Sequence, residues 1–421
     1  MTITAYAWEL LHGYVGNVGS PLFYVALLLV FFQYRRQNRL ERQMFGLRVT
    51  SPLEQTVLSF IYGVVAGAIV TVLLSLLGVV LNPRDFTYIW TVALLLSLFN
   101  VRYICFAYAG GLLSLLSLLL HTLPPLSFTM PFIDAIYHDL LALQVPHVLS
   151  LVAVLHLIEA ALVRLQGGER NTPVFVIGKR GRLVGGFALQ KFWVLPMAAV
   201  VLTGTSTSLH PPPWWGILPL SVLSGLEIIP IPAVLGYSGV AVAHEPRTKA
   251  KRTSRAIGLY SVCLLLLVIG SSYAQGFIWL AAVFAPLAHE MLVLWDRADE
   301  RNRTPLYVHP ERGLRILEVL PDSPANEMGL RSGESIVKVN GMEVNTKYDM
   351  HVAIDRNPAF VKLEVADMRG EIRLVQKPLY EGERYALGVI LVPDEESDHY
   401  VRIESIPLWR AIWKKRHETS V

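Results

Sequence analysis

The side chains best suited to chemistry are acidic and imidazole groups that fall inside apolar stretches. They are His156, Glu159, Glu227, His289 and Glu290. His156 and Glu159 are three residues apart, which places them on one face of a helix, and the other three lie beside prolines. Ionisable groups at membrane depth are costly, and broken helices can hold substrates in transporters. The alternative, which we favour, is that these groups satisfy one another and free carbonyls inside a helix bundle.

Two hydrolytic chemistries are suggested by short motifs, and neither is complete. A membrane zinc protease needs two His one helical turn apart with a Glu between them, but His244-Glu245 and His289-Glu290 each lack the second His. A rhomboid-type serine protease uses a G-x-S-G pattern, which Ser238 matches. Because Ser238 precedes a basic loop, it would lie near the cytoplasmic end of its span, away from a shared cavity with a His. We therefore predict no enzyme, no catalytic residues, no metal and no cofactor.

The composition places most of the chain in a membrane. Of 421 residues, 53% are hydrophobic and 17% are charged, and the mean hydropathy is +0.44. The net charge of +4 could suit nucleic acid, but Lys and Arg lie between apolar runs, as they do in membrane proteins, so no nucleic-acid partner is expected. Cys105 and Cys263 both fall in apolar segments, so neither a disulfide nor a thiolate metal site is predicted.

About nine apolar runs are expected to cross the bilayer as a bundle of α-helices. They cover residues 15–34, 58–81, 86–100, 103–120, 148–163, 192–203, 217–242, 256–272 and 277–295. Basic clusters within 35–48, 164–191 and 247–255 mark cytoplasmic loops, which puts the N-terminus outside and the C-terminus inside. Residues 173–189 alternate like a small β-hairpin, and 121–146 is expected to be an external loop with an interfacial helix.

This pattern divides the chain into five parts. Residues 1–18 are an external or interfacial segment, 19–295 the multi-span membrane domain, 296–310 a charged linker, 311–395 a cytoplasmic domain, and 396–421 a basic tail. Within the tail, residues 406–416 suit an amphipathic helix on the inner membrane surface, where lipid would be a partner.

The cytoplasmic domain carries the most informative pattern. Strands are predicted at 314–320, 335–339, 361–366, 371–376 and 387–392, with helices at 325–328 and 347–356. Ser323 and Thr346 are the expected helix N-caps, and Gly329 allows a left-handed helix stop. The order strand, S-P-A, helix, G-L, G-E, I-V-K-V-N-G resembles a PDZ domain of the bacterial, circularly permuted kind, a small α+β fold.

The PDZ resemblance implies a groove in which a peptide or a protein C-terminus adds a strand beside the helix at 347–356. The residues that it implies for this groove are Tyr348, Val352, Leu387, Gly388, Val389 and Ile390. Residues 387–390 are similar to the carboxylate-binding loop of the family, and 307–314 is an alternative loop that the sequence leaves open. The chain ends in E-T-S-V, which resembles a PDZ ligand, so that self-recognition and a free tail are both alternatives.

Many spans, an outside N-terminus and a C-terminal PDZ domain without a protease motif together resemble the MinJ-type cell-division topological determinants. The likeness extends through LGYSGVAVAHEPRTKAKRTSR and FAPLAHE. The resemblance implies a scaffold in the bacterial cell membrane, at septa and poles, that bridges proteins of the MinD and DivIVA type and can self-associate. The alternative is a membrane component of secretion, signalling or transport whose PDZ domain presents a substrate or regulates a protease.

Overall fold

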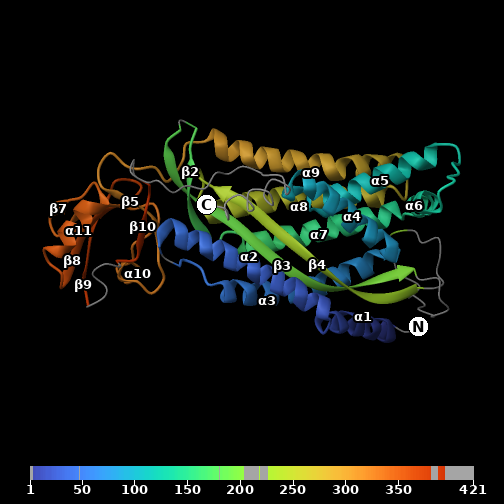
Figure 1. Ribbon diagram of the computed structural model, residues 1–421, viewed down its shortest axis with the longest axis horizontal. Coiled ribbons are helices and arrows are strands. Elements are labelled where there is room, and N and C mark those ends of the chain that lie inside the picture. Colours follow the sequence, from blue (N-terminus) through green and yellow to red (C-terminus); the bar gives the residue numbers. More distant parts are fainter. Residues whose placement is uncertain are drawn as a thin grey trace, which may run out of the picture.

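The computed structural model describes residues 3–46, 48–179, 181–202, 218, 226–380 and 387–393. It has two parts (Figure 1). An apolar body, residues 3–302, consists of helices around a long β-hairpin, and a small sheet domain, residues 314–391, lies at one end of it. The predicted tail at 396–421 lies outside the described residues.

The helices that the structure describes in the body do not correspond one to one to the predicted spans. They are α1 (Ile3–Val18), α2 (Pro21–Phe45), α3 (Pro52–Leu77), α4 (Pro83–Phe99), α5 (Phe106–Thr122), α6 (Pro131–Leu141), α7 (Val145–Gln166), α8 (Pro246–Gly270) and α9 (Gly276–Asn302), with a 3-10 turn η1 (Val101–Tyr103) before α5. Within the described residues, four helices (α3, α7, α8 and α9) are long and apolar enough to cross a membrane, and α1 with α2, bent by 49°, would make a fifth. The predicted count of nine helical spans is therefore not supported.

Two of the predicted spans are wrong, because residues 192–203 and 217–242 fall largely in strands. β3 (Leu183–Leu202) pairs antiparallel with β4 (Leu226–Ala241) along the full length of β4. On its other edge it pairs antiparallel with β2 (Thr172–Ile177) and parallel with β1 (Val80–Leu81). Figure 1 shows this hairpin running diagonally through the body. A continuous apolar run looks the same in a buried strand and in a buried helix, which explains the error. The hairpin predicted at 173–189 is confirmed as β2–β3, and the helix predicted within 121–146 as α6.

Prolines in the long hairpin mark main-chain positions that point away from the hydrogen-bond ladder between β3 and β4. Pro196 and Pro232 lie opposite each other, and because neither has an N–H, this pair cannot exchange ladder hydrogen bonds. Their ring nitrogens therefore point away from the ladder. Ala198, two residues further on, has the same orientation and donates its N–H to Thr71 Oγ1 at 3.0 Å. Pro230 and Pro232 are thus strand positions, not the helix break that the sequence suggested.

Helix α3 covers the outer edge of β3 by close backbone approach. A Cβ on Gly63 would overlap the carbonyl of Val194, and one on Gly67 would overlap that of Pro196. Gly63, Gly67 and Thr71 follow one another at intervals of four, so they form one stripe along α3. Lipid offers no hydrogen-bond partner to an open strand edge. The stripe therefore allows β3 to lie inside an apolar body.

The sheet domain matches the predicted elements within two residues. It contains β5 (Leu314–Val319), α10 (Pro324–Glu327), β6 (Ser335–Val339), β7 (Met342–Glu343), α11 (Lys347–Asp355), β8 (Phe360–Ala366), β9 (Ile372–Pro378) and β10 (Val389–Leu391). The sheet order is β10-β5-β6-β8-β9, with β7 beside β6. The predicted caps are confirmed: Ser323 accepts from the N–H of Asn326, Thr346 forms a capping box with Asp349, and Gly329 is left-handed.

Candidate functional site

The helical side of the predicted groove lies on α11. Met350, Ala353 and Ile354 face inward and are buried in the core of the sheet domain. Tyr348 is 76% exposed, and Val352 is half-buried. Because a helix that buries one face presents the other to its surroundings, Tyr348 and Val352 are available for contact.

The strand side of the predicted groove is more buried. Leu387 belongs to the same core as α11, and Val389 packs against it while half-buried. Gly388 has a φ of 82°, and a Cβ there would overlap Ser323, so this position needs glycine. Among the described residues, β10 has a strand neighbour, β5, on one edge only. The structure therefore brings Leu387 and Val389 to the core that α11 covers.

Ile390 is turned away from this core. Its side chain, with Val392 and Leu317, belongs to the hydrophobic core of the body. The side chain of Ile390 helps to attach the sheet domain to the body, and the predicted place of this position in the groove would depend on its main chain. This follows from the alternation of side chains along a strand, since neighbours of Ile390 on β10 point to the opposite face.

The alternative carboxylate loop, residues 307–314, is engaged in contacts of its own. Tyr307 is buried and packs its ring edge-on against Phe187, with 5.3 Å between centroids. Its carbonyl accepts from the N–H of Gly185 at 2.8 Å. At the other end of the loop, Gly313 donates its N–H to Asn345 Oδ1 at 2.9 Å. The segment thus anchors the sheet domain to the body.

Glu318 lies on β5 beside this attachment. It pairs with Ile390 across the sheet, and its Oε1 accepts from the N–H of Val319. Burial raises the pKa of Glu318 to about 7, with the hydrogen bond acting weakly in the other direction. The carboxyl therefore titrates near neutral pH at the boundary between the two parts.

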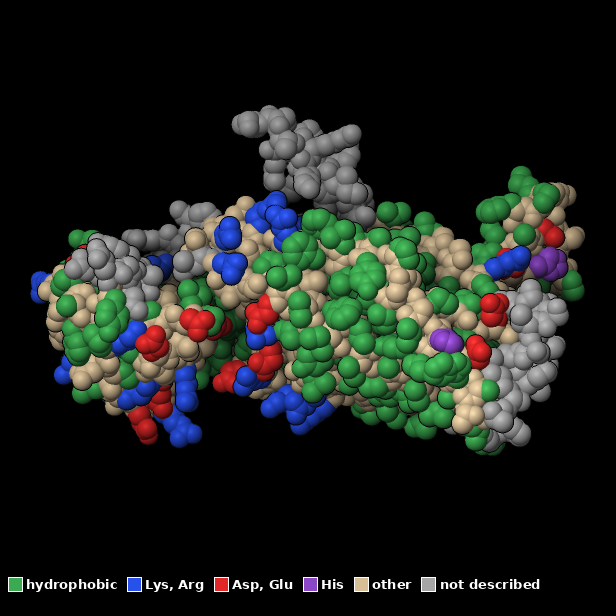
Figure 2. Space-filling model, turned by 90° about the horizontal axis from the view of Figure 1, so that it is seen from below, with side chains coloured by type: hydrophobic (Ala, Val, Ile, Leu, Met, Phe, Trp, Pro, Cys, Tyr) green, Lys and Arg blue, Asp and Glu red, His purple; other side chains and the backbone are tan. Residues whose placement is uncertain are grey.

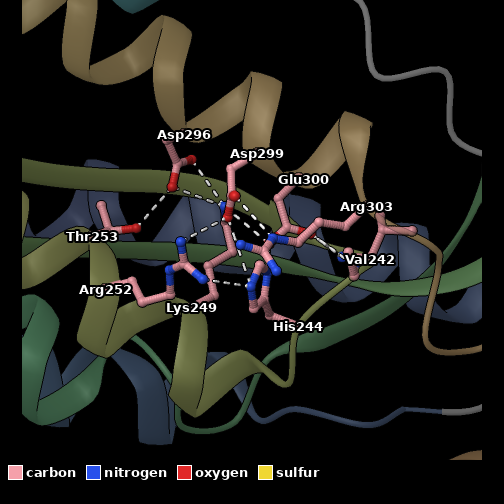
Figure 3. A network of polar contacts seen from close by, with 10 residues as sticks. Val242, His244, Lys249, Arg252, Thr253, Asp296, Asp299, Glu300 and Arg303 are labelled. Carbon is pink, nitrogen blue, oxygen red and sulfur yellow. Dashed lines mark hydrogen bonds and ion pairs between the residues drawn. The ribbon is translucent and has the colours of Figure 1, made fainter.

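A charged network ties α8, α9 and the end of β4 together (Figure 3). Lys249, buried on α8, lies 2.9 Å from both carboxylate oxygens of Asp296 and 3.4 Å from Glu300. Glu300 also accepts from the N–H groups of Val242 and Ala243 and from His244 Nδ1 at 2.7 Å. Each buried charge thus has an opposite charge or a hydrogen-bond donor, which is what a buried ion network requires.

The two incomplete His-Glu motifs lie in separate surroundings. His244 belongs to the charged network, and Glu245 is the N-cap of α8. Glu290 accepts from Arg102 and from Tyr108, each at 2.6 Å. Ser238, the residue of the G-x-S-G pattern, lies in β4 opposite Gln190. Its predicted place at the end of a helical span is therefore wrong.

The remaining ionisable residues have different environments. Glu227, which we expected inside the bilayer, is exposed in β4 opposite Val201.

His156 and His289 are brought together, and Cys105 contacts both: Cys105 Sγ is 3.3 Å from His156 Nε2 and 3.7 Å from His289 Nε2. Sequence reasoning missed this cluster, because its members come from three elements and only the cysteine count drew attention to Cys105.

Basic side chains gather at the end of the body that carries the sheet domain. A hollow there is lined by Arg35, Arg39, Arg42 and Arg48. Figure 2 shows charged side chains mostly toward this end and a broad apolar surface beyond them. This is the distribution expected of a body that is embedded in a membrane and has one charged end.

No family model matches the chain. It is 27% identical over 389 residues to the cell division topological determinant MinJ of Bacillus subtilis (strain 168), an alignment that covers 90% of this chain and 94% of that protein. It is also 27% identical over 252 residues, 58% of this chain and 65% of the relative, to the probable cell division topological determinant MinJ of Lacticaseibacillus paracasei. The resemblance predicted from the sequence is confirmed.

Proposed function

We propose that this chain is a non-enzymatic membrane scaffold that helps to place the division site, with partners of the MinD and DivIVA type. The observation that carries the proposal is the extent of the similarity, which covers 94% of a relative named as a cell division topological determinant. Both the body and the sheet domain therefore fall within the shared region. A scaffold gains from this architecture, since membrane attachment and clustering raise the avidity of modest contacts.

The sheet domain is proposed to be a circularly permuted PDZ domain that binds a peptide or a protein C-terminus. Its support is the element order, the free edge of β10 among the described residues, and the exposure of Tyr348 on α11. In this arrangement a peptide would add a strand to β10, and Tyr348 and Val352 would contact its side chains. The side chain of Ile390 faces the body, so in the proposed groove this position would contribute main-chain atoms and not a side chain.

The sheet domain is proposed to lie in the cytoplasm. The support is its position at the same end as the basic residues of α2 and α8. The arginine-lined hollow would contact anionic lipid headgroups there, since clustered arginines next to a membrane attract them. The absence of catalysis is supported by the separate partners of His244 and Glu290.

A fluorescent fusion of the full chain tests this function. The proposal predicts that the fusion gathers at septa and poles of dividing cells, and that deletion of the chain misplaces septa. A uniform signal around the cell would contradict it and favour a secretion, signalling or transport component. In that case, substitution of Glu159 or Glu227 should impair solute uptake.

A further inference from the structure

Three side chains with metal-binding atoms meet inside the body. The Sγ of Cys105 and one ring nitrogen each of His156 and His289 all lie within 4.8 Å of one another. His156 is 2% exposed, and the other two are half-buried. The three residues come from the start of α5, the middle of α7 and the middle of α9, so the cluster links three helices.

Small residues bring these helices close enough to meet. Gly110 of α5 approaches α7, where a Cβ would press against Val152. Gly111, the next residue, approaches α9, where a Cβ would overlap Pro286. Two adjacent glycines thus let α5 pack against both neighbours at once, as small residues do in membrane bundles.

The imidazole of His156 is oriented by a contact on its far side. Its Nδ1 lies 2.8 Å from the carbonyl oxygen of Val152 and donates to it. The Nε2 lone pair is therefore presented to Cys105, which is the orientation found in metal-ligating histidines. The edge-on rings of Tyr108 and Tyr260 pack against His289 and shield the cluster.

The cluster leaves one ring nitrogen without a partner. A thiol has a single proton, so Cys105 can donate to only one of the two imidazole nitrogens beside it, and the second contact needs a proton on His289 Nε2. His289 Nδ1 then has no hydrogen-bond partner in the described structure, which is costly for a buried polar atom. One sulfur and two imidazole nitrogens that converge in this way are also the ligand types that zinc binds.

We propose that Cys105, His156 and His289 bind a zinc ion that joins α5, α7 and α9 inside the body. Zinc bonds of about 2.3 Å to sulfur and about 2.0 Å to nitrogen, at tetrahedral angles, separate the ligand atoms by roughly 3.5 Å. The two Cys105 separations, 3.3 Å and 3.7 Å, bracket this value.

Glu159 is the carboxylate beside His156. Its Oε2 lies 3.9 Å from His156 Nε2, whereas Glu290 is occupied by Arg102 and Tyr108. Glu159 is not among the three residues whose ligand atoms all lie within 4.8 Å of one another, so the described structure supplies three protein ligands. A shift of the Glu159 side chain would add a fourth ligand, and one thiolate and one carboxylate would then balance the charge of Zn²⁺.

Metal analysis of the full chain, purified in detergent without chelators, tests the proposal. We expect zinc in a one-to-one ratio with the chain, and loss of most of it in Cys105→Ser and His289→Ala. Cys263→Ser is the matched control, because it removes the other free cysteine and should retain the metal. Cobalt-substituted wild-type protein should show a thiolate-to-cobalt absorption band that Cys105→Ser lacks.

The wild-type protein alone can overturn the proposal. A chelator should lower the Tm of the wild-type protein by several degrees, and added zinc should restore it. This test remains valid even if a variant fails to fold. Folded wild-type protein with negligible zinc, unable to take up zinc or cobalt, would contradict the proposal. So would a Cys105→Ser variant that keeps the metal content of the Cys263→Ser control.

Discussion

The carbonyl oxygen of Tyr307 accepts a 2.8 Å hydrogen bond from the N–H of Gly185 in β3. This bond and the neighbouring one, from the N–H of Leu306 to the carbonyl of Val242, join the sheet domain's leading segment to β3 and to the residue that follows β4. The domain is therefore attached to a rigid element of the body instead of hanging on a free linker, so the orientation of any partner it holds would be set relative to the membrane.

Tyr307→Ala should loosen this attachment. Removing a buried aromatic ring costs about 3–5 kcal/mol in a packed core, and here the loss falls on the contact with Phe187. We expect faster proteolysis within residues 303–313, while the body keeps its helical content. Tyr348→Ala, at an exposed tyrosine, is the control and should leave the cleavage rate unchanged. Equal cleavage rates for wild type and Tyr307→Ala would argue against the attachment.

Gly63→Ala should destabilise the body, because a methyl group there would overlap the backbone of β3. Overpacking of this kind typically costs about 1–3 kcal/mol, and the backbone carbonyl of Val194 cannot move away without disturbing the hairpin. Thermal unfolding in detergent measures the effect. Gly16→Ala, in a helix with open space around it, is the control and should be neutral. An unchanged Tm for Gly63→Ala would show that α3 does not seal the strand edge.

Lys249→Met should also destabilise the protein. It would leave the carboxylates of Asp296 and Glu300 without the cation that lies between them, and breaking a buried pair on one side costs about 3–5 kcal/mol. Chemical unfolding followed by Trp fluorescence measures the loss. Lys251→Met, at an exposed position of the same helix, should change little, and similar losses in both variants would contradict the role of the network.

Stability should fall as the pH rises through the titration of Glu318. Its pKa is raised from 4.5 to about 7 in the folded chain, so the unfolded chain loses this proton first, and folding becomes less favourable between these two values. Glu318→Gln should remove the decline and make the protein more stable than wild type at pH 8 but not at pH 4.5. Glu343→Gln, at an exposed position, should keep the wild-type profile. Identical profiles for all three would count against the burial of Glu318.

The sheet domain could be predicted from sequence because its signals are local. Ser323, Gly329 and Thr346 each begin or end a helix by their own chemistry, and alternation along β8 gives its strand period. The long hairpin could not be predicted from sequence, because β3 is almost continuously apolar and buried on both faces. Its prolines suggested a broken helix, although Pro196 and Pro232 mark edge positions of paired strands. The Cys105 cluster depends on long-range packing, so no spacing in the sequence indicates it.

The most direct test of the scaffold account follows a MinD-type partner in cells that carry Tyr348→Ala with Val352→Asp. Both substitutions lie on the outward side of α11, so the variant should fold and its own fusion should still gather at septa. The account predicts that the partner loses its septal signal, while Asp355→Ala, at another exposed position of α11, leaves it in place. A partner that stays at septa in the double variant would contradict recruitment through this domain.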